Sequence, residues 1–141
     1  MSTILIIEDE TKIADILRSY LESEGFAVEA TTSGLKGLEL ARAMPFDAAV
    51  VDVMMPGMDG LAVLDELKKL DDDIAVVMVT AYASVDTAVD AMKRGALDYI
   101  TKPFKNDEVL VVLRNALERR QLVSENRALR QNLQARANRF G

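Results

Sequence analysis

Short apolar runs alternate along the chain with longer segments in which apolar residues recur every three or four positions. The runs predict strands over residues 3–7, 26–30, 48–51, 74–79 and 97–101. The longer segments predict helices near residues 11–24, 34–44, 60–70 and 84–94, with a further helix from about 106 onward. Five strands alternating with five helices indicate an α/β domain whose parallel sheet is covered by helices on both faces.

The polarity of the runs also predicts the order of the strands. A strand that is buried on both faces is apolar throughout, whereas a strand at the edge alternates. The first, third and fourth runs are almost continuously apolar, but Glu29 and Asp98 interrupt the second and fifth. We therefore expect the doubly wound, flavodoxin-like order 2-1-3-4-5, in which ligands bind at the carboxyl ends of the strands.

Composition narrows the chemistry that such a domain can perform. The 141 residues suffice for one domain with a core, and they contain neither cysteine nor histidine. Disulfides, thiolate nucleophiles, the usual zinc ligands and the commonest general base are thus excluded. No apolar run approaches the roughly 20 residues that span a bilayer, and no signal peptide is visible. We expect a cytoplasmic protein without a membrane partner that uses carboxylates, hydroxyls, lysine or a hard metal ion.

Charge is distributed unevenly along the chain. Residues 1–113 carry 21 acidic and 10 basic side chains, whereas residues 114–141 carry seven arginines and two glutamates. The acidic body is a poor surface for nucleic acid. The basic tail differs from it in kind, which suggests a separate structural role.

Polar side chains follow four of the predicted strands. Acids occupy positions 8–10 after the first strand, Asp52 ends the third, Thr80 ends the fourth and Lys102 follows the fifth. Each has an ordinary interpretation: an acid near position 10 can cap the next helix, and Lys102 can be a surface charge. Together, at one edge of a parallel sheet, they are expected to converge on one pocket.

Such a cluster supports phosphoryl transfer. Two carboxylates about 4 Å apart repel by roughly 4 kcal/mol at an effective dielectric constant near 20, and Mg²⁺ relieves that repulsion while keeping open positions. Asp52 is then a candidate nucleophile that is already ionised at neutral pH and needs no base. The Lys102 ammonium and the Thr80 hydroxyl can each contact a phosphoryl oxygen.

Four segments together resemble the receiver domains of bacterial two-component response regulators, over residues 1–118. These segments are IIEDE (6–10), VVDVMMPGMDG (50–60), VMVTAYA (77–83) and LDYITKPF (97–104). The resemblance implies a regulatory phosphoprotein rather than an enzyme with a separate substrate, with Asp52 accepting a phosphoryl group from a sensor histidine kinase. It implies that Asp9 binds Mg²⁺ directly, Glu8 through water and Met54 through its backbone carbonyl.

The resemblance also implies a conformational switch made of Thr80 and Tyr99. The threonine hydroxyl would move toward the phosphoryl group, and the tyrosine ring would turn inward behind it. Plain packing at an edge strand remains the alternative for Tyr99. A cis peptide bond between Lys102 and Pro103, which would aim the lysine at the pocket, is a further expectation.

Residues 106–137 contain neither proline nor glycine and predict one long helix with two apolar stripes. The first stripe should pack on the sheet: Leu110, Leu113 and Leu117. The second, about 150° away, has coiled-coil spacing and is called the seam here: Leu122, Asn126, Leu129 and Leu133. An asparagine in a seam tends to fix register. We therefore expect residues 119–141 to form a linker that pairs in a parallel homodimer.

Two observations leave alternatives open for the tail. Arg119 and Arg136 interrupt the seam, so a solvated helix with incidental leucines remains possible. A DNA-binding arm is another reading of the arginines, but they are spread among acids and leucines, and we expect no direct contact with nucleic acid.

Residues 81–104 and 116–131 resemble enhancer-binding transcription activators of the nitrogen-regulator type, in which an ATPase and a DNA-binding domain follow. Neither domain is present in these residues.

Three other functions compete with a receiver. An aspartyl-phosphate hydrolase of the haloacid dehalogenase type has a second acid two residues after its nucleophile, where this chain has Met54. A flavodoxin-like cofactor binder needs a hydroxyl-rich loop after the first strand, where this chain has EDETK. A dimerisation module without phosphorylation would not need the acids, Thr80 and Lys102 together.

Overall fold

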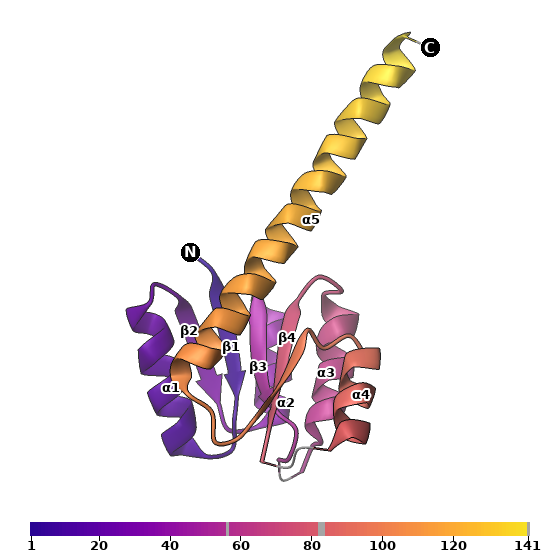
Figure 1. Ribbon diagram of the computed structural model, residues 1–141. Coiled ribbons are helices and arrows are strands. Elements are labelled where there is room, and N and C mark those ends of the chain that lie inside the picture. Colours follow the sequence, from indigo (N-terminus) through magenta and orange to yellow (C-terminus); the bar gives the residue numbers. More distant parts are fainter. Residues whose placement is uncertain (56, 82–83, 141) are drawn as a thin grey trace.

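The computed structural model describes residues 1–55, 57–81 and 84–140, without the side chains of residues 123, 124 and 134–140. Arg136, predicted to interrupt the seam, is therefore outside the described side chains. Ten elements follow one another along the chain (Figure 1): β1 (Thr3–Ile7), α1 (Thr11–Ser23), β2 (Ala27–Thr31), α2 (Gly34–Ala43), β3 (Ala48–Asp52), α3 (Gly60–Leu70), β4 (Ala75–Thr80), α4 (Val85–Lys93), β5 (Asp98–Thr101) and α5 (Asn106–Phe140). Apart from the C-terminal end of α5, every predicted boundary agrees with the structure to within one residue.

The five strands form one parallel sheet in the order β2-β1-β3-β4-β5, so the predicted fold class and strand order are confirmed. Every residue of β3 and β4 is buried, whereas β2 and β5 each carry exposed or half-buried positions. This difference is the one that the continuous and interrupted apolar runs predicted.

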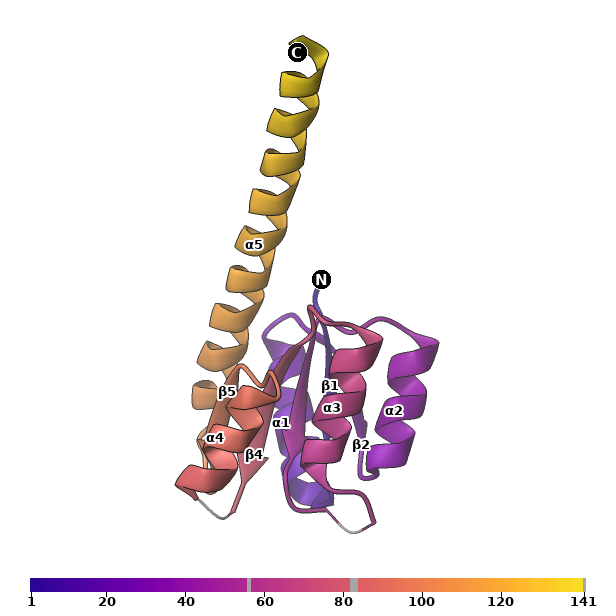
Figure 2. The same ribbon diagram turned by 90° about the vertical axis from the view of Figure 1, so that its right-hand side faces the viewer.

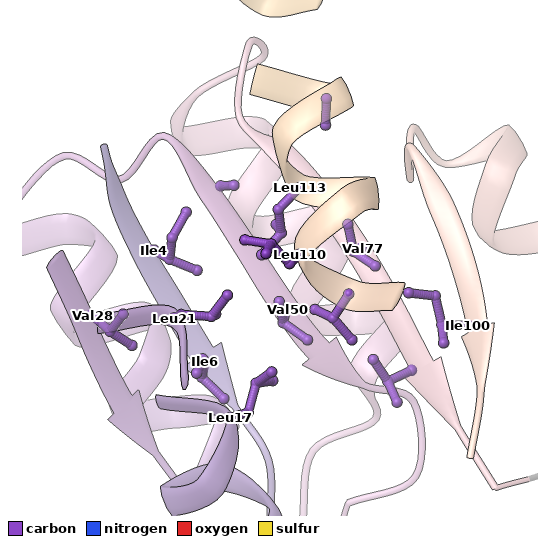
Figure 3. Close-up of a cluster of buried hydrophobic side chains, with 14 of the residues drawn as sticks. Ile4, Ile6, Leu17, Leu21, Val28, Val50, Val77, Ile100, Leu110 and Leu113 are labelled. Carbon is purple, nitrogen blue, oxygen red and sulfur yellow. The ribbon is translucent and has the colours of Figure 1, made fainter. Parts of the chain in front are cut away.

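Helices cover both faces of the sheet and create two hydrophobic cores (Figures 1 and 2). Side chains alternate between the faces along each strand, so Ile4 and Ile6 face α1 and α5 while Leu5 and Ile7 belong to the core beneath α2 and α3. Figure 3 shows the first core, in which Leu110 of α5 lies over the sheet. Because all five strands are parallel, their carboxyl ends lie at the same end of the sheet.

Three helices begin with a side-chain cap, and α1 does not. The Ser33 hydroxyl accepts a hydrogen bond from the Lys36 amide at the start of α2, and Asp59 accepts one from the Leu61 amide at the start of α3. Ser84 does the same for α4. Glu10 occupies the N-cap position of α1 but makes no side-chain capping bond. The ordinary explanation for an acid at this position therefore does not account for Glu10.

Helix α5 is supported by the sheet over only its first three turns. Val109, Leu110, Leu113 and Ala116 are buried and Leu117 is half-buried, which confirms the predicted packing of the first stripe. The helix then continues without interruption beyond the body of the domain (Figure 1). The seam leucines there are 54–64% exposed. Pairing through the seam, and the division at residues 118 and 119, remain predictions.

None of the helices, over the residues described, is long and apolar enough to cross a membrane.

Candidate functional site

The carboxyl ends of β1 and β3 bring three acids together. One carboxylate oxygen from each of Glu8, Asp9 and Asp52 lies within 4.8 Å of the others. Glu8 and Asp52 are only 4% and 3% exposed, whereas Asp9 is half-buried. Like charges at this spacing in a buried place repel one another strongly unless a cation or a bound proton compensates them.

Lys102 supplies a positive charge from the loop that follows β5. Its Nζ lies 2.6 Å from Oε1 of Glu8, 3.1 Å from Oδ2 of Asp52 and 3.5 Å from Oε1 of Glu10. Its backbone amide donates to the carbonyl of Thr80 at 2.7 Å, which ties the loop to the end of β4. The peptide bond between Lys102 and Pro103 is cis, as expected from the sequence.

The backbone around Asp52 fixes the position of its carboxylate. The next residue, Val53, donates its amide to the carbonyl of Val79 at 2.8 Å and so continues the sheet. Oδ1 of Asp52 accepts a hydrogen bond from the Met54 amide at 3.1 Å. Oδ2 faces Lys102, so each carboxylate oxygen has a defined partner.

Gly60 allows α3 to start directly against this strand end. A Cβ at residue 60 would lie 2.1 Å from the Asp52 carbonyl oxygen and 2.7 Å from the Val53 Cα. The Gly60 amide also donates to the Val53 carbonyl at 3.0 Å. Only glycine permits this approach without moving the backbone that carries Asp52.

Burial and mutual repulsion perturb the ionisation of the cluster. Burial, followed by the contact with Asp52, raises the pKa of Glu8 from 4.5 to about 8, against the opposing effect of Lys102. Burial acts to raise the pKa of Asp9, but contacts with Asp52 and Glu8 outweigh it and the pKa is lowered. Burial acts to lower the pKa of Lys102, but its ion pairs with Glu8 and Asp52 prevail and raise it.

The donor set matches a hard divalent cation. Three carboxylates with no thiolate or imidazole nearby are typical of Mg²⁺ or Ca²⁺ sites, and the chain has no cysteine or histidine to offer. The raised pKa of Glu8 indicates that Lys102 alone does not neutralise the cluster. The residues present therefore fit a bound Mg²⁺, with Glu8, Asp9 and Asp52 around it.

The remaining predicted residues lie at the end of β4, within β5 and just after β3. Thr80 is 1% exposed at the end of β4. Tyr99 lies on β5 opposite Met78 of β4, half-buried against the core beneath α2 and α3. The Met54 side chain is 57% exposed and takes no part in the acidic cluster. The roles of these three residues remain predictions.

Glu10 was expected near the pocket as part of the run of acids after the first strand, but it was given no role of its own. The sequence suggested a helix cap, but the side chain reaches Lys102 instead. Its position directly after two acids of the cluster was the available signal.

Comparison with known proteins assigns the chain to a family. A model of the response regulator receiver domain matches residues 4–114, so the chain belongs to that family, as the motifs predicted. The match does not support the hydrolase or the cofactor binder, whereas it does not test the dimerisation module without phosphorylation.

Similar proteins include transcriptional regulators and solved receiver structures. YkoG of Bacillus subtilis (strain 168), an uncharacterized transcriptional regulatory protein, is 43% identical over 114 residues, which are 81% of this chain and 50% of YkoG. The crystal structure of NtrX from Brucella abortus is 35% identical, with a TM-score of 0.86 over 92% of this chain and 30% of NtrX. A response regulator from Burkholderia pseudomallei with a phosphorylated aspartic acid, calcium ion and citrate is 34% identical, with a TM-score of 0.77 over 92% of this chain and 75% of that one.

The chain thus spans half of YkoG and less than a third of NtrX. The likeness to NtrX agrees with the expected resemblance to the nitrogen-regulator type.

Proposed function

We propose that this chain is a phosphoacceptor that takes a phosphoryl group from a sensor histidine kinase onto Asp52. The observation that carries the proposal is the position of the Asp52 carboxylate, 3.1 Å from the Lys102 ammonium and within 4.8 Å of oxygens of Glu8 and Asp9. The Burkholderia relative with a phosphorylated aspartic acid and a calcium ion gives the proposal a precedent in a similar protein.

In the proposed reaction, a carboxylate oxygen of Asp52 attacks the phosphorus of phosphohistidine. A P–O bond forms, the P–N bond breaks, and the imidazole nitrogen of the donor leaves with the bonding electron pair. Mg²⁺ would neutralise charge on the phosphoryl oxygens. Asp9, Asp52 and the Met54 carbonyl would hold the ion directly, and Glu8 would hold it through water. Because the product remains attached to Asp52, the chain acts as a regulatory phosphoprotein.

Lys102 and Thr80 would stabilise the transferred group. The raised pKa of Lys102 keeps its ammonium charged throughout the neutral range, so it can pass from Asp52 to a phosphoryl oxygen as that charge develops. Thr80, at the neighbouring strand end, can donate its hydroxyl to another oxygen. Movement of Thr80 would then make room for the Tyr99 ring, which is the proposed switch.

The output of the switch is proposed to be transcriptional and to involve a dimer. YkoG and ZraR of Escherichia coli are named transcriptional regulatory proteins, and this chain covers only part of each. The exposed seam leucines offer a surface for a second copy of the chain, and Asn126 among them would set a parallel register.

Labelling with acetyl phosphate tests the phosphoacceptor directly. Intact-protein mass spectrometry should show the gain of one phosphoryl group in the presence of Mg²⁺ and none with EDTA. Asp52→Asn should abolish labelling, whereas Asp15→Asn, at an exposed position of α1, should be labelled like the parent. Retention of a hydroxylamine-sensitive phosphoryl group by the Asp52→Asn variant would contradict the assignment.

A further inference from the structure

The outer part of α5 has charged contacts with the domain where its apolar contacts end. Buried side chains of α5 stop at Ala116, and Leu117 is half-buried. Beyond that point, two arginines, Arg120 and Arg127, reach back to acids in loops of the body. These contacts are formed at the edge of the sheet opposite the acidic cluster, where the strands begin.

Arg120 joins two of these loops. Its Nη1 donates to Oδ1 of Asp47 at 2.9 Å and to the Asp47 carbonyl at 3.1 Å, and its Nη2 donates to Oδ2 of Asp71 at 3.4 Å. Farther along the helix, Nη1 of Arg127 lies 3.3 and 3.4 Å from the two carboxylate oxygens of Asp73. A planar guanidinium that uses several donors at once is geometrically more restrictive than a point charge.

The acids that receive the arginines are themselves held by backbone. Oδ2 of Asp47 accepts the Thr3 amide at 2.8 Å, and the Asp47 amide donates to the Thr3 carbonyl at 2.9 Å. The Ala75 amide donates to the Asp47 carbonyl, so Asp47 connects the beginnings of β1 and β4. Asp71 ends α3 and accepts the Asp73 amide at 2.9 Å. Arg120 and Arg127 therefore meet acids whose positions are fixed by the sheet and by α3.

Helical geometry places these arginines opposite the seam. At about 100° per residue, Arg127 lies about 20° from Arg120 around the helix. By the same spacing, the seam residues lie roughly 180° to 240° from Arg120. One face of the extension therefore contacts the domain and the other faces away from it.

We propose that Arg120 and Arg127, with Asp47, Asp71 and Asp73, form an arginine clamp that fixes the direction of the α5 extension relative to the domain. The clamp determines which face of the extension is presented to a second copy of the chain, and it keeps the domain off the seam. Its ion pairs join arginines of the basic tail to acids of the body. The contacts of the clamp all lie within one chain, so a second copy is not needed to form them.

Distances within one chain test the clamp. Because the chain contains no cysteine, Lys36→Cys on α2 and Gln131→Cys on the extension give two unique sites for spin labels, both at exposed positions. Labelled protein is diluted into unlabelled protein, so that pulsed electron paramagnetic resonance reports distances within a chain. The parent should give one narrow distance distribution at low salt.

Matched variants separate the clamp from the intrinsic stiffness of the helix. Arg120→Ala with Arg127→Ala should broaden the distribution at least twofold, and so should 1 M salt in the parent, because the screening length falls to about 3 Å. Arg130→Ala should leave it narrow, since Arg130 is exposed and forms no ion pair with any described residue. An unchanged width in the double variant would overturn the proposal.

A charge exchange tests the clamp even if the Arg120→Ala, Arg127→Ala double variant loses helix. Asp73→Arg alone should broaden the distance distribution, because it places a second positive charge beside Arg127. Adding Arg127→Glu should restore the narrow distribution by re-forming the pair with reversed charges. Circular dichroism checks that helix content is equal in both variants. Failure of the second change to restore the distribution would also overturn the proposal.

Discussion

The Lys102 ammonium lies 3.1 Å from Oδ2 of Asp52, although the two residues are fifty positions apart in the chain. The same ammonium lies 2.6 Å from Glu8, so one lysine is shared by two buried carboxylates. Without a metal ion, it is the one positive side chain within ion-pair distance of the acidic cluster among the residues that the structure describes. We therefore expect Lys102 and a bound Mg²⁺ to balance the negative charge of these acids together.

Replacement of Lys102 by alanine should make stability depend strongly on Mg²⁺. Removing one partner of a buried ion pair typically costs about 3–5 kcal/mol. Because metal-free Glu8 already holds a proton below about pH 8, the loss should lie toward the lower value. Saturating Mg²⁺ should recover much of it. Chemical denaturation with Mg²⁺ or EDTA measures both effects, and Lys105→Ala, at an exposed position in the same loop, is the control. Equal loss of stability in both conditions would argue against a shared role.

Stability in EDTA should fall as pH rises between about 5 and 8. The pKa of Glu8 is raised to about 8 in the folded state, so the folded chain binds a proton that the unfolded chain releases near pH 4.5. The lowered pKa of Asp9 acts below this window and the raised pKa of Lys102 above it. The chain has no histidine to add a competing titration.

Thermal unfolding across that pH range measures the effect. Glu8→Gln, which has the same shape and does not titrate, should flatten the dependence. Mg²⁺ should bind more tightly at the upper end of the range, because it binds ionised Glu8. A parent profile that is flat in EDTA, or a slope that persists in Glu8→Gln, would show that another group is responsible.

Gly60→Ala should damage both the fold and the site. Its Cβ would lie 2.1 Å from the Asp52 carbonyl, so the backbone must move, at a cost of about 3 kcal/mol or more. Gly34→Ala is the matched control, because Gly34 is also the first residue of a helix but its Cβ would meet only side chains of Val63 and Met58. We expect denaturation to show a smaller loss for Gly34→Ala. Acetyl phosphate should label it faster than Gly60→Ala.

Tyr99→Leu should separate phosphorylation from its consequence. Asp52 and Lys102 are unaffected, so labelling by acetyl phosphate should proceed at nearly the parent rate. Hydrogen exchange should then show less phosphorylation-dependent change around β4, β5 and α4 than in the parent. Tyr99→Phe is the control for the ring. Identical exchange changes in the leucine variant would leave Tyr99 with a packing role only.

Replacement of Leu129 and Leu133 by glutamine should convert a dimer into a monomer. Both side chains are exposed in the single chain, 59% and 64%, so the change should cost the isolated domain less than about 0.5 kcal/mol. Light scattering measures the mass, and Gln131→Ala on the same stretch is the control. A dimer that survives the double substitution would place the interface elsewhere.

The fold could be predicted from the sequence because burial dictates the apolar pattern strand by strand. Continuous runs marked the central strands, and the interruptions at Glu29 and Asp98 marked the edges. The meeting of Glu8, Asp52 and Lys102 followed from topology, since parallel strands end at one edge. No knowledge of individual side-chain conformations was required.

Contacts between α5 and the surface loops of the domain could not be predicted from the sequence in the same way. Arg120 meets Asp47 across 73 positions, and nothing in the local pattern near either residue indicates the pair. Glu10 illustrates the same difficulty at short range, because the sequence allowed its side chain either to cap the helix or to join the pocket. Such choices depend on rotamers and on loop geometry.

The uninterrupted course of α5 makes the extension a lever. At about 1.5 Å per residue, residues 118–140 project about 34 Å beyond the last apolar support. A tilt of about 10° at the base would carry the far end sideways by about 6 Å, more than one helical turn along the axis. A shift too small to unpack the sheet would therefore be amplified into a displacement of several ångströms at the far end of the helix.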